Sequence, residues 1–186
     1  MENISAGELR KLIFTDHYGR KVLYLRGKGL SKVPEALTDL TELERLVLSH
    51  NYLKELPTSI NKLKNLKGLR LDDNQLRELP HSICELSNLT GLFVDYNQLS
   101  VLPANIKHLK NLRFLHLRYN QLKTLPDEIG ELKKLYWLYQ YVAGNPLTSE
   151  GLRKLVKLQN KMKFVTDVTG KDMKCSLFVF YFMSCE

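Results

Sequence analysis

Cysteine is scarce in this sequence, and the few that occur lie far apart. The 186 residues contain three cysteines, Cys84, Cys175 and Cys185, and no closely spaced pair among them. Small extracellular domains are usually dense in disulfides, whereas cytosolic proteins keep their thiols reduced. The composition therefore argues against a disulfide-linked scaffold. It predicts a reducing compartment, and we expect the cytoplasm.

Long apolar runs are absent as well. The longest wholly apolar run, from Leu177 to Met183, is far short of the ~20 residues that a membrane-spanning helix needs. Residues 1–20 lack the apolar stretch of a secretory signal. We therefore expect neither a membrane span nor a cleaved leader.

The motifs of common catalytic and metal sites are also missing. The sequence contains no C-x-x-C, no H-E-x-x-H and no G-x-x-x-x-G-K-[ST]. Its histidines are scattered and do not cluster as zinc ligands do: His17, His50, His81, His108 and His116. We expect no metal, no cofactor and no catalytic residue, and we predict that the protein is not an enzyme.

What the sequence does contain is a repeat of 23 residues. Asparagines and prolines recur at this spacing: Asn51, Asn74, Asn97 and Asn120, and Pro34, Pro57, Pro80, Pro103 and Pro126. The full unit is L-x-x-L-x-L-x-x-N-x-L-x-x-L-P-x-x-I-x-x-L-x-x, and it fits nearly every framework position from Leu23 to Leu132. A fixed period of about 20 to 29 residues is typical of leucine-rich repeats.

Each unit predicts one short strand and one helical turn. In Leu46-Val47-Leu48, the strand period of two points both leucines inward and Val47 outward. Asn51 then bonds backbone groups of neighbouring turns, and Pro57 opens the helical turn. No unit can bury its leucines alone, so the units must stack. The predicted fold class is α/β: a leucine-rich repeat solenoid, as a curved right-handed stack with a concave parallel sheet and convex short helical turns.

Two caps are predicted around the repeats. Residues 1–20 form an N-terminal cap, in which Ser5 and Glu8 fit a capping box at the start of a short helix. Residues 21–147 hold about six repeats, residues 148–174 form a C-terminal helical cap, and residues 175–186 are an apolar tail of unknown role. Asn145 arrives two residues late, so an insertion near Gln140 and Tyr141 is either a local bulge or a tyrosine displaced into a binding site.

The concave face is the predicted binding face, because the sheet is left open on that side. Its strand positions carry aromatic residues beside charged ones, which is the composition of protein-binding hot spots. The predicted partner-binding residues are Arg45, Arg70, Asp72, Asp73, Phe93, Asp95, Tyr96, Phe114, His116, Arg118, Tyr119, Trp137 and Tyr139. We expect the energetic centre in the later repeats, where the aromatics concentrate.

Three further expectations concern this face. The aspartates either neutralise neighbouring arginines or, as exposed charges, set the rate of partner association. Gly68 and Gly91 should leave a shallow dip for a partner side chain. His116 and Asp95 should meet across adjacent strands, but no serine or cysteine stands beside His116 as a nucleophile.

The net charge of +8 and the pI of about 9.3 leave a second function open. Lysines gather on the returning segments, at Lys62, Lys64, Lys67, Lys107, Lys110, Lys133 and Lys134. They are either a solvated convex face or a surface for nucleic acid or anionic membrane.

The step Leu79-Pro80-His81-Ser82-Ile83-Cys84-Glu85-Leu86 resembles the 23-residue repeats of the Ras-pathway scaffold, Scribble and plant Ras-group proteins. The resemblance covers roughly Val22 to Leu158. It implies a non-catalytic signalling adaptor or regulator that binds a protein partner, with a small GTPase or a phosphatase as candidates. We expect a monomer.

Overall fold

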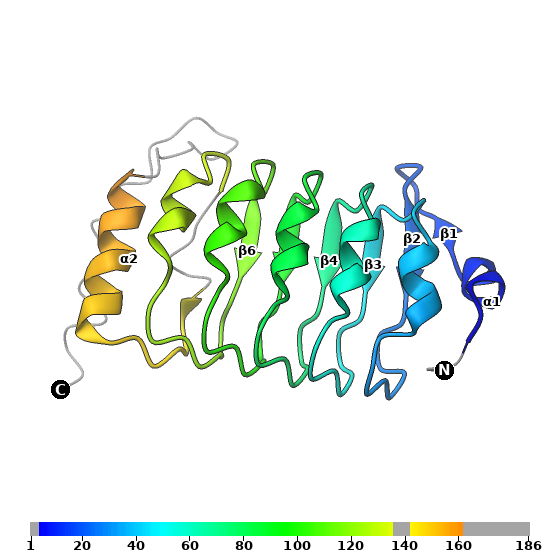
Figure 1. The fold of residues 1–186 in the computed structure, drawn as a ribbon, viewed down its shortest axis with the longest axis horizontal. Helices are drawn as coiled ribbons and strands as arrows, with labels where there is room; N and C mark the ends of the chain where they lie inside the picture. The colour runs from blue at the N-terminus through cyan, green and yellow to red at the C-terminus, as the bar shows by residue number, and fades with distance from the viewer. Residues whose placement is uncertain (1–3, 136–141, 162–186) are drawn as a thin grey trace.

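The computed structural model describes residues 4–135 and 142–161, and they form a solenoid (Figure 1). One sheet runs through it with its six strands in chain order. They are β1 (Phe14–Thr15), β2 (Lys21–Tyr24), β3 (Arg45–Val47), β4 (Gly68–Arg70), β5 (Gly91–Phe93) and β6 (Phe114–His116). Strands β2 to β6 are parallel and in register, so that residues one repeat apart lie side by side.

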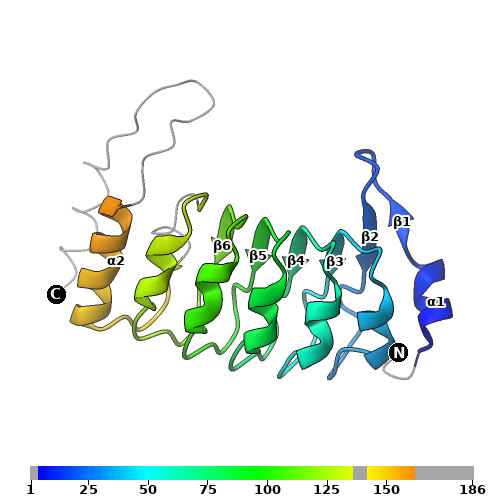
Figure 2. The same cartoon turned by 45° about the horizontal axis from the view of Figure 1, so that its top comes forward.

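The segments that return the chain form a second layer opposite the sheet (Figure 2). Each contains a 3₁₀ helix: η1 (Glu35–Asp39), η2 (Thr58–Lys62), η3 (His81–Glu85), η4 (Ala104–His108) and η5 (Asp127–Glu131). The predicted proline stands at the N-cap of each one, as Pro57 does in η2. Because a 3₁₀ helix has three residues per turn, residues three apart share a face, and Ile60 and Leu63 are both buried.

The core lies between these two layers. Leu46 and Leu48 are fully buried, as predicted. Val47 faces the other way, but it too is buried, with 8% of its surface exposed. It pairs in register with Tyr24 on one side and Arg70 on the other, and these large side chains flank it. Val47 therefore points outward as predicted and is nevertheless buried, and so is Val22, which is 3% exposed.

A ladder of asparagine amides joins the repeats, as predicted. Asn51 accepts hydrogen bonds from the N–H groups of Lys28 and Leu30, each at 3.0 Å, and donates to the carbonyl of Leu25 at 2.9 Å in the preceding repeat. Asn74, Asn97, Asn120 and Asn145 repeat this pattern. These bonds satisfy backbone groups that the stack buries.

The N-terminal end of the stack is covered by α1 (Ala6–Lys11) and β1. The predicted capping box is present, since Glu8 N–H donates to Ser5 Oγ at 3.2 Å while Glu8 accepts from Ser5 N–H at 3.0 Å. Leu9 of α1 is fully buried. Strand β1 was not predicted. It pairs antiparallel with β2 and so covers the sheet edge that a first repeat would leave unpaired.

The helix α2 (Ser149–Lys161) stands at the other end and packs against η5. Its Leu155 and Leu158 are buried. Two glycines allow the close approach: a Cβ at Gly130 would lie 2.9 Å from Leu158, and a Cβ at Gly151 would lie 2.3 Å from the Lys123 carbonyl oxygen. Of the helices in the described part of the chain, none has the length and apolar character of a membrane span.

The chain is back in register after the predicted insertion. Tyr119 N–H donates to the Ala143 carbonyl at 2.9 Å, just as Tyr96 N–H donates to the Arg118 carbonyl one repeat earlier. Ala143 therefore stands at the position that Arg118 holds one repeat earlier. The insertion itself, near Gln140 and Tyr141, and the apolar tail at 175–186 lie outside the described residues.

Candidate protein-binding face

The predicted partner-binding residues follow the concave sheet face in columns. Arg45 pairs with Gly68, Gly68 with Gly91 and Gly91 with Phe114. The next column runs through Arg70, Phe93 and His116. The register therefore brings these residues together as expected. Trp137 and Tyr139, which were expected to extend the columns, lie outside the described residues.

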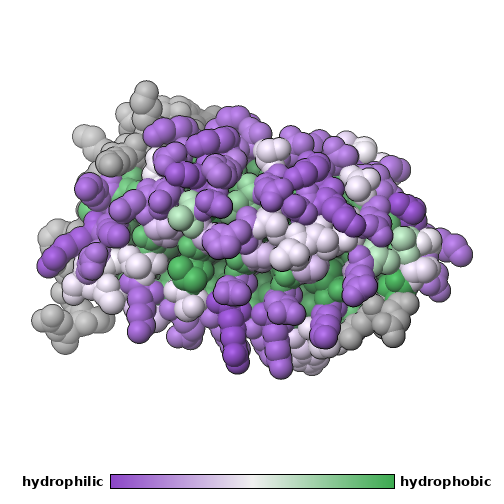
Figure 3. All heavy atoms as spheres, viewed as in Figure 1, coloured by the Kyte–Doolittle hydropathy of each residue, from purple (hydrophilic) through white to green (hydrophobic). Residues whose placement is uncertain are grey.

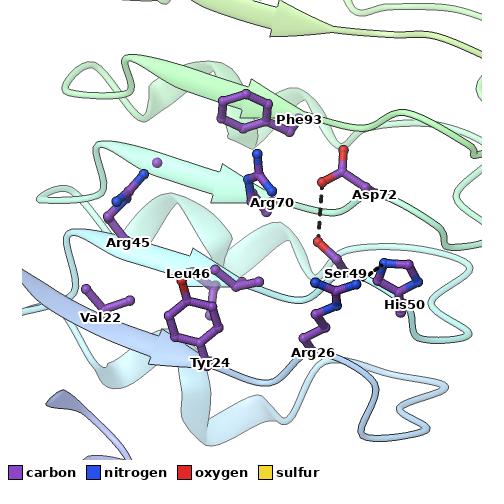
Figure 4. A pocket seen from close by; sticks show the side chains of 12 residues that line it. Val22, Tyr24, Arg26, Arg45, Leu46, Ser49, His50, Arg70, Asp72 and Phe93 are labelled. Atoms are coloured by element: carbon purple, nitrogen blue, oxygen red, sulfur yellow. Dashed lines mark hydrogen bonds between the residues drawn. The ribbon is translucent and has the colours of Figure 1, made fainter. Parts of the chain in front are cut away.

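This face contains a hollow of about 260 Å³ over β2 to β5 (Figure 4). Val22, Val47 and Gly68 line it between the rings of Tyr24 and Phe93. It lies nearer the N-terminus than the aromatic centre that we predicted. Residues left out of the predicted site also line it: Val22, Tyr24, Arg26, Leu46, Val47, Ser49 and His50. Tyr24, Arg26, Ser49 and His50 stand one repeat before Val47, Ser49, Asp72 and Asp73, so the 23-residue step is the signal that could have found them.

The dip predicted at two glycines exists at one of them. Gly68 lines the hollow, and a Cβ there would meet Arg45 Nε at 3.4 Å, because the Arg45 side chain lies across the open position. At Gly91 the ring of Phe93 fills the space instead, so that a Cβ would lie 2.8 Å from the ring. Gly91 is buried. The prediction of a dip at Gly91 is therefore wrong, because the aromatic ring two residues on folds over it.

Three arginines border the hollow, and each is held differently (Figure 4). The Arg70 guanidinium lies 4.7 Å from the centre of the Phe93 ring, a cation–π contact. Arg26 donates to His50 Nε2 at 2.9 Å, and His50 Nδ1 lies 3.1 Å from Asp73. Arg45 has Asp16 as its nearest carboxylate, at 4.0 Å, and Asp16 is already paired with Arg20 at 2.7 Å.

The carboxylates of Asp72 and Asp95 accept hydrogen bonds from neighbouring repeats. Asp72 accepts hydrogen bonds from Ser49 Oγ and from the Asp95 N–H, each at 3.3 Å. Asp95 accepts from the Arg118 N–H at 2.7 Å, and 15% of its side chain is exposed. The interpretation of Asp72 and Asp95 as exposed charges is therefore wrong, because both carboxylates join one repeat to the next. Burial raises the pKa of Asp72, and Asp95 raises it further, while Arg70 opposes them.

The aromatic residues of the later repeats form two groups. Phe93 and His116 meet edge to face at 4.6 Å between ring centres. Tyr96 and Tyr119 stack in parallel, also at 4.6 Å, and both are exposed. These tyrosines have left-handed backbones, with φ of 54° and 52°. Phe114 is 42% exposed.

The left-handed conformation belongs to one position of every described repeat. His50, Asp73, Tyr96 and Tyr119 share it with Gly27 and Gly144. Residues other than glycine rarely adopt this backbone conformation, so the backbone of this column is strained wherever glycine is absent. It was not foreseen, although the two glycines of the column pointed to it.

His116 and Asp95 do meet, with 3.5 Å between Nδ1 and Oδ2. The imidazole of His116 also lies edge to face against the ring of Phe93. Across residues 4–135 and 142–161, histidine, cysteine and acidic residues nowhere form a group of three or more that could hold a metal ion.

The convex lysines are mostly paired with acids of adjacent repeats. Lys62 bonds Asp39 at 3.1 Å, Lys64 bonds Glu85 at 3.3 Å and Lys67 bonds Glu44 at 2.5 Å. Lys107 and Lys110 share Glu131, and Lys134 bonds the Asn111 amide at 2.6 Å. The face that Figure 3 shows is mostly hydrophilic. Five of the seven lysines thus have an acidic partner, while Lys133 and Lys134 bond neutral oxygens.

Comparison with known proteins identifies the repeats. Family models described as leucine rich repeat match residues 19–76, 41–99 and 111–132, which together make up more than half of the chain. No curated protein sequence matches it.

Several solved structures are similar. A leucine-rich repeat protein of Leptospira interrogans is 33% identical over 72% of this chain, with a TM-score of 0.54. The BIR2 ectodomain from Arabidopsis thaliana is 29% identical over 72%, with a TM-score of 0.60, and the leucine-rich repeat domain of the type III effector XopL is 28% identical over 73%, with a TM-score of 0.64. The chain spans 40% of the Leptospira protein, 72% of BIR2 and 48% of the XopL domain.

The repeat period, the asparagine ladder, the parallel sheet backed by 3₁₀ turns and these matches agree with one another. The chain belongs to the leucine-rich repeat family.

Proposed function

We propose that this chain is a non-catalytic interaction module that binds one folded protein partner along its concave face, acting as a signalling adaptor or regulator. Proteins of this family generally mediate protein–protein interactions. The observation that carries the proposal is the concave display of aromatic side chains that remain about half exposed: Tyr24, Tyr96, Phe114 and Tyr119.

The size of this display suits a protein interface. An aromatic side chain buries about 150–250 Å² when it is covered, and a standard interface buries about 800 Å² on each partner. Three or four covered aromatics would therefore supply much of the apolar area on this side. Arginines lie next to these aromatics, and arginine, like tyrosine and tryptophan, is enriched at binding hot spots.

The finer parts of the proposal rest on sequence. The resemblance to Ras-pathway scaffold and Scribble-type repeats makes a small GTPase or a phosphatase the first partner to test. The scattered cysteines support a cytoplasmic location, and Cys84 is a buried free thiol. We propose that the chain acts as a monomer.

The test compares two double variants. Phe114→Ala with Tyr119→Ala removes two concave aromatics. Tyr52→Ala with Val101→Ala removes two apolar side chains that are somewhat more exposed and lie outside the sheet strands. Each protein is cross-linked in cell lysate, and the captured proteins are identified by mass spectrometry.

We expect at least one protein to be captured by the wild type and by the Tyr52 and Val101 variant, but not by the Phe114 and Tyr119 variant. Identical captures by all three proteins would refute the concave face as the binding surface. A capture that consists of nucleic acid and falls steeply with salt would instead favour the basic convex surface.

A further inference from the structure

The hollow over β2 to β5 carries more positive than negative charge. The guanidinium groups of Arg26, Arg45 and Arg70 line it, with Asp72 as its only acidic lining residue. Two further carboxylates outside the hollow are linked to its arginines. Asp73 contacts His50, which bonds Arg26, and Asp16 is shared between Arg20 and Arg45. In the lining itself, three guanidiniums face one carboxylate, and Asp95 adds its charge next to Asp72.

Two of these arginines have donors to spare. Arg70 contacts the Phe93 ring, and no described carboxylate oxygen lies within 4.0 Å of it. Arg45 reaches Asp16 only at 4.0 Å. A guanidinium carries five N–H donors in a planar fork that matches a carboxylate. The Arg70 fork lies over the ring of Phe93, and the Arg45 side chain lies across Gly68.

Asp72 offsets this charge only in part, although the charge of Arg70 does act on it and opposes the rise in its pKa. Both of its oxygens already accept hydrogen bonds from Ser49 and from the Asp95 backbone. The positive charge of the hollow is therefore offset only in part by the chain itself.

The rest of the hollow is apolar and small. Val22 and Val47 are buried at its floor, and the rings of Tyr24 and Phe93 form its sides. Cavities for whole small-molecule ligands usually measure about 300–1,000 Å³. At about 260 Å³ the hollow suits one or two side chains of a partner.

We propose that this hollow is the subsite for an acidic side chain of the protein partner, bound between Arg45 and Arg70 next to an apolar side chain that rests on Val47. The inference rests on the proposed concave-face binding and deepens it by naming the chemistry of the partner segment, an aspartate or glutamate beside an aromatic or branched aliphatic residue.

The probe is a display library of random linear peptides, sorted against the immobilised full chain at low salt. The most enriched peptide is then synthesised twice, once as selected and once with its acidic residue replaced by the matching amide. Affinities of both peptides are measured for the wild type, Arg70→Ala, Arg45→Ala and the controls Arg77→Ala and Arg113→Ala, which remove exposed arginines outside the hollow.

We expect the enriched peptides to share an acidic residue next to an apolar one. Arg70→Ala should weaken the acidic peptide by about tenfold but change the amide peptide little, because the two losses come from the same contact. Arg77→Ala and Arg113→Ala should leave both affinities unchanged. Gly68→Val keeps every charge but adds a side chain beside Arg45, and it should also weaken binding.

Three results would overturn the inference: a selection without acidic enrichment, equal losses for the acidic and amide peptides, or displacement of the peptide by phosphatidylserine vesicles while no acidic peptide competes. In each case the Phe114 and Tyr119 variant decides separately on the proposed function. If that variant still loses its partner, concave binding stands and only the acidic subsite fails.

Discussion

The Asn97 amide makes four hydrogen bonds, two to the preceding repeat and two within its own. It accepts from the Leu76 N–H at 2.9 Å and donates to the carbonyls of Leu71, Val94 and Asp95 at 3.0 to 3.2 Å. Asn88 also links repeats, through one bond to the Lys64 carbonyl at 2.9 Å, but it is exposed. Water can replace a bond only at the exposed site.

We therefore expect Asn97→Ala to lower the free energy of unfolding by about 2–4 kcal/mol, since it leaves more than one buried backbone group unpaired. Asn88→Ala should cost less than about 1 kcal/mol. Urea unfolding of the two variants measures the difference. Equal losses would mean that the ladder is not the main connection between repeats.

Asp72 and Asp16 should make the free energy of unfolding depend on pH in opposite directions. The pKa of Asp72 is raised from 3.8 by burial, so its protonated form is favoured in the fold. Its contribution is therefore greatest below 3.8 and is lost as the pH rises through the raised value. The pKa of Asp16 is lowered to about 2 by its hydrogen bond from Arg20. Its contribution is present above 3.8 and is lost as the pH falls towards 2.

We expect Asp72→Asn to gain stability relative to the wild type as the pH rises from 3.8, and Asp16→Asn to be most destabilised at neutral pH, with its deficit shrinking in acid. Urea midpoints across this range test both slopes. A deficit of Asp16→Asn that is independent of pH would show that the Arg20 contact does not stabilise the charged carboxylate.

At the level of elements, the repeat period predicted the strands and turns because it specifies which side chains must be buried. The two terminal helices were predicted separately from the period, the first from its capping box and the second from the expected helical cap. The repeat period could not predict β1, since Phe14 and Thr15 lie outside the repeat and pair with β2 only after the chain has turned. It did not reveal the left-handed column, because that conformation depends on backbone geometry at the strand end.

The contact of α2 with the last turn depends on a glycine. A Cβ at Gly151 would lie 2.3 Å from the Lys123 carbonyl oxygen, which is backbone and cannot rotate away. Gly7 is also in a helix, but a Cβ there would meet Ser5 Oγ only at 4.0 Å. The same substitution therefore tests packing at one helix and propensity at the other.

We expect Gly151→Ala to destabilise the C-terminal end of the stack, by about 1–3 kcal/mol for an overpacked contact, whereas Gly7→Ala should be neutral or stabilise by up to about 1 kcal/mol. Thermal melts of the two variants provide the comparison. If Gly151→Ala melts with or above the wild type, α2 is not packed as closely as described.

For the molecule as a whole, the register of the concave columns was predictable from the 23-residue step, but the shape of the face was not. The ring orientation of Phe93 determines whether Gly91 leaves a dip. Hydrogen bonds from Ser49 and from the Asp95 backbone determine whether the Asp72 carboxylate is free. Both depend on side-chain packing, which the repeat period does not specify. The dip at Gly68 was predicted, but the other residues that line the hollow were left out of the predicted site for that reason.

A stack in which each repeat contacts only its neighbours should also unfold in parts. Leu9 in α1 and Leu92 in β5 are both fully buried, so Leu→Ala at either position should cost about 2–5 kcal/mol locally. Hydrogen exchange separates them through two reporter amides: Leu25 N–H, which donates to the Val47 carbonyl, and Val94 N–H, which donates to the His116 carbonyl.

We expect Leu9→Ala to reduce protection of the Leu25 amide while the Val94 amide keeps most of its protection, because loss of the cap lets the first repeat open before the rest. Leu92→Ala should reduce protection of the Val94 amide most, since it weakens the contacts on both sides of β5. Equal losses at both amides in both variants would show that the repeats unfold as a single cooperative unit, and the hollow over β2 to β5 would then be as stable as the centre of the stack.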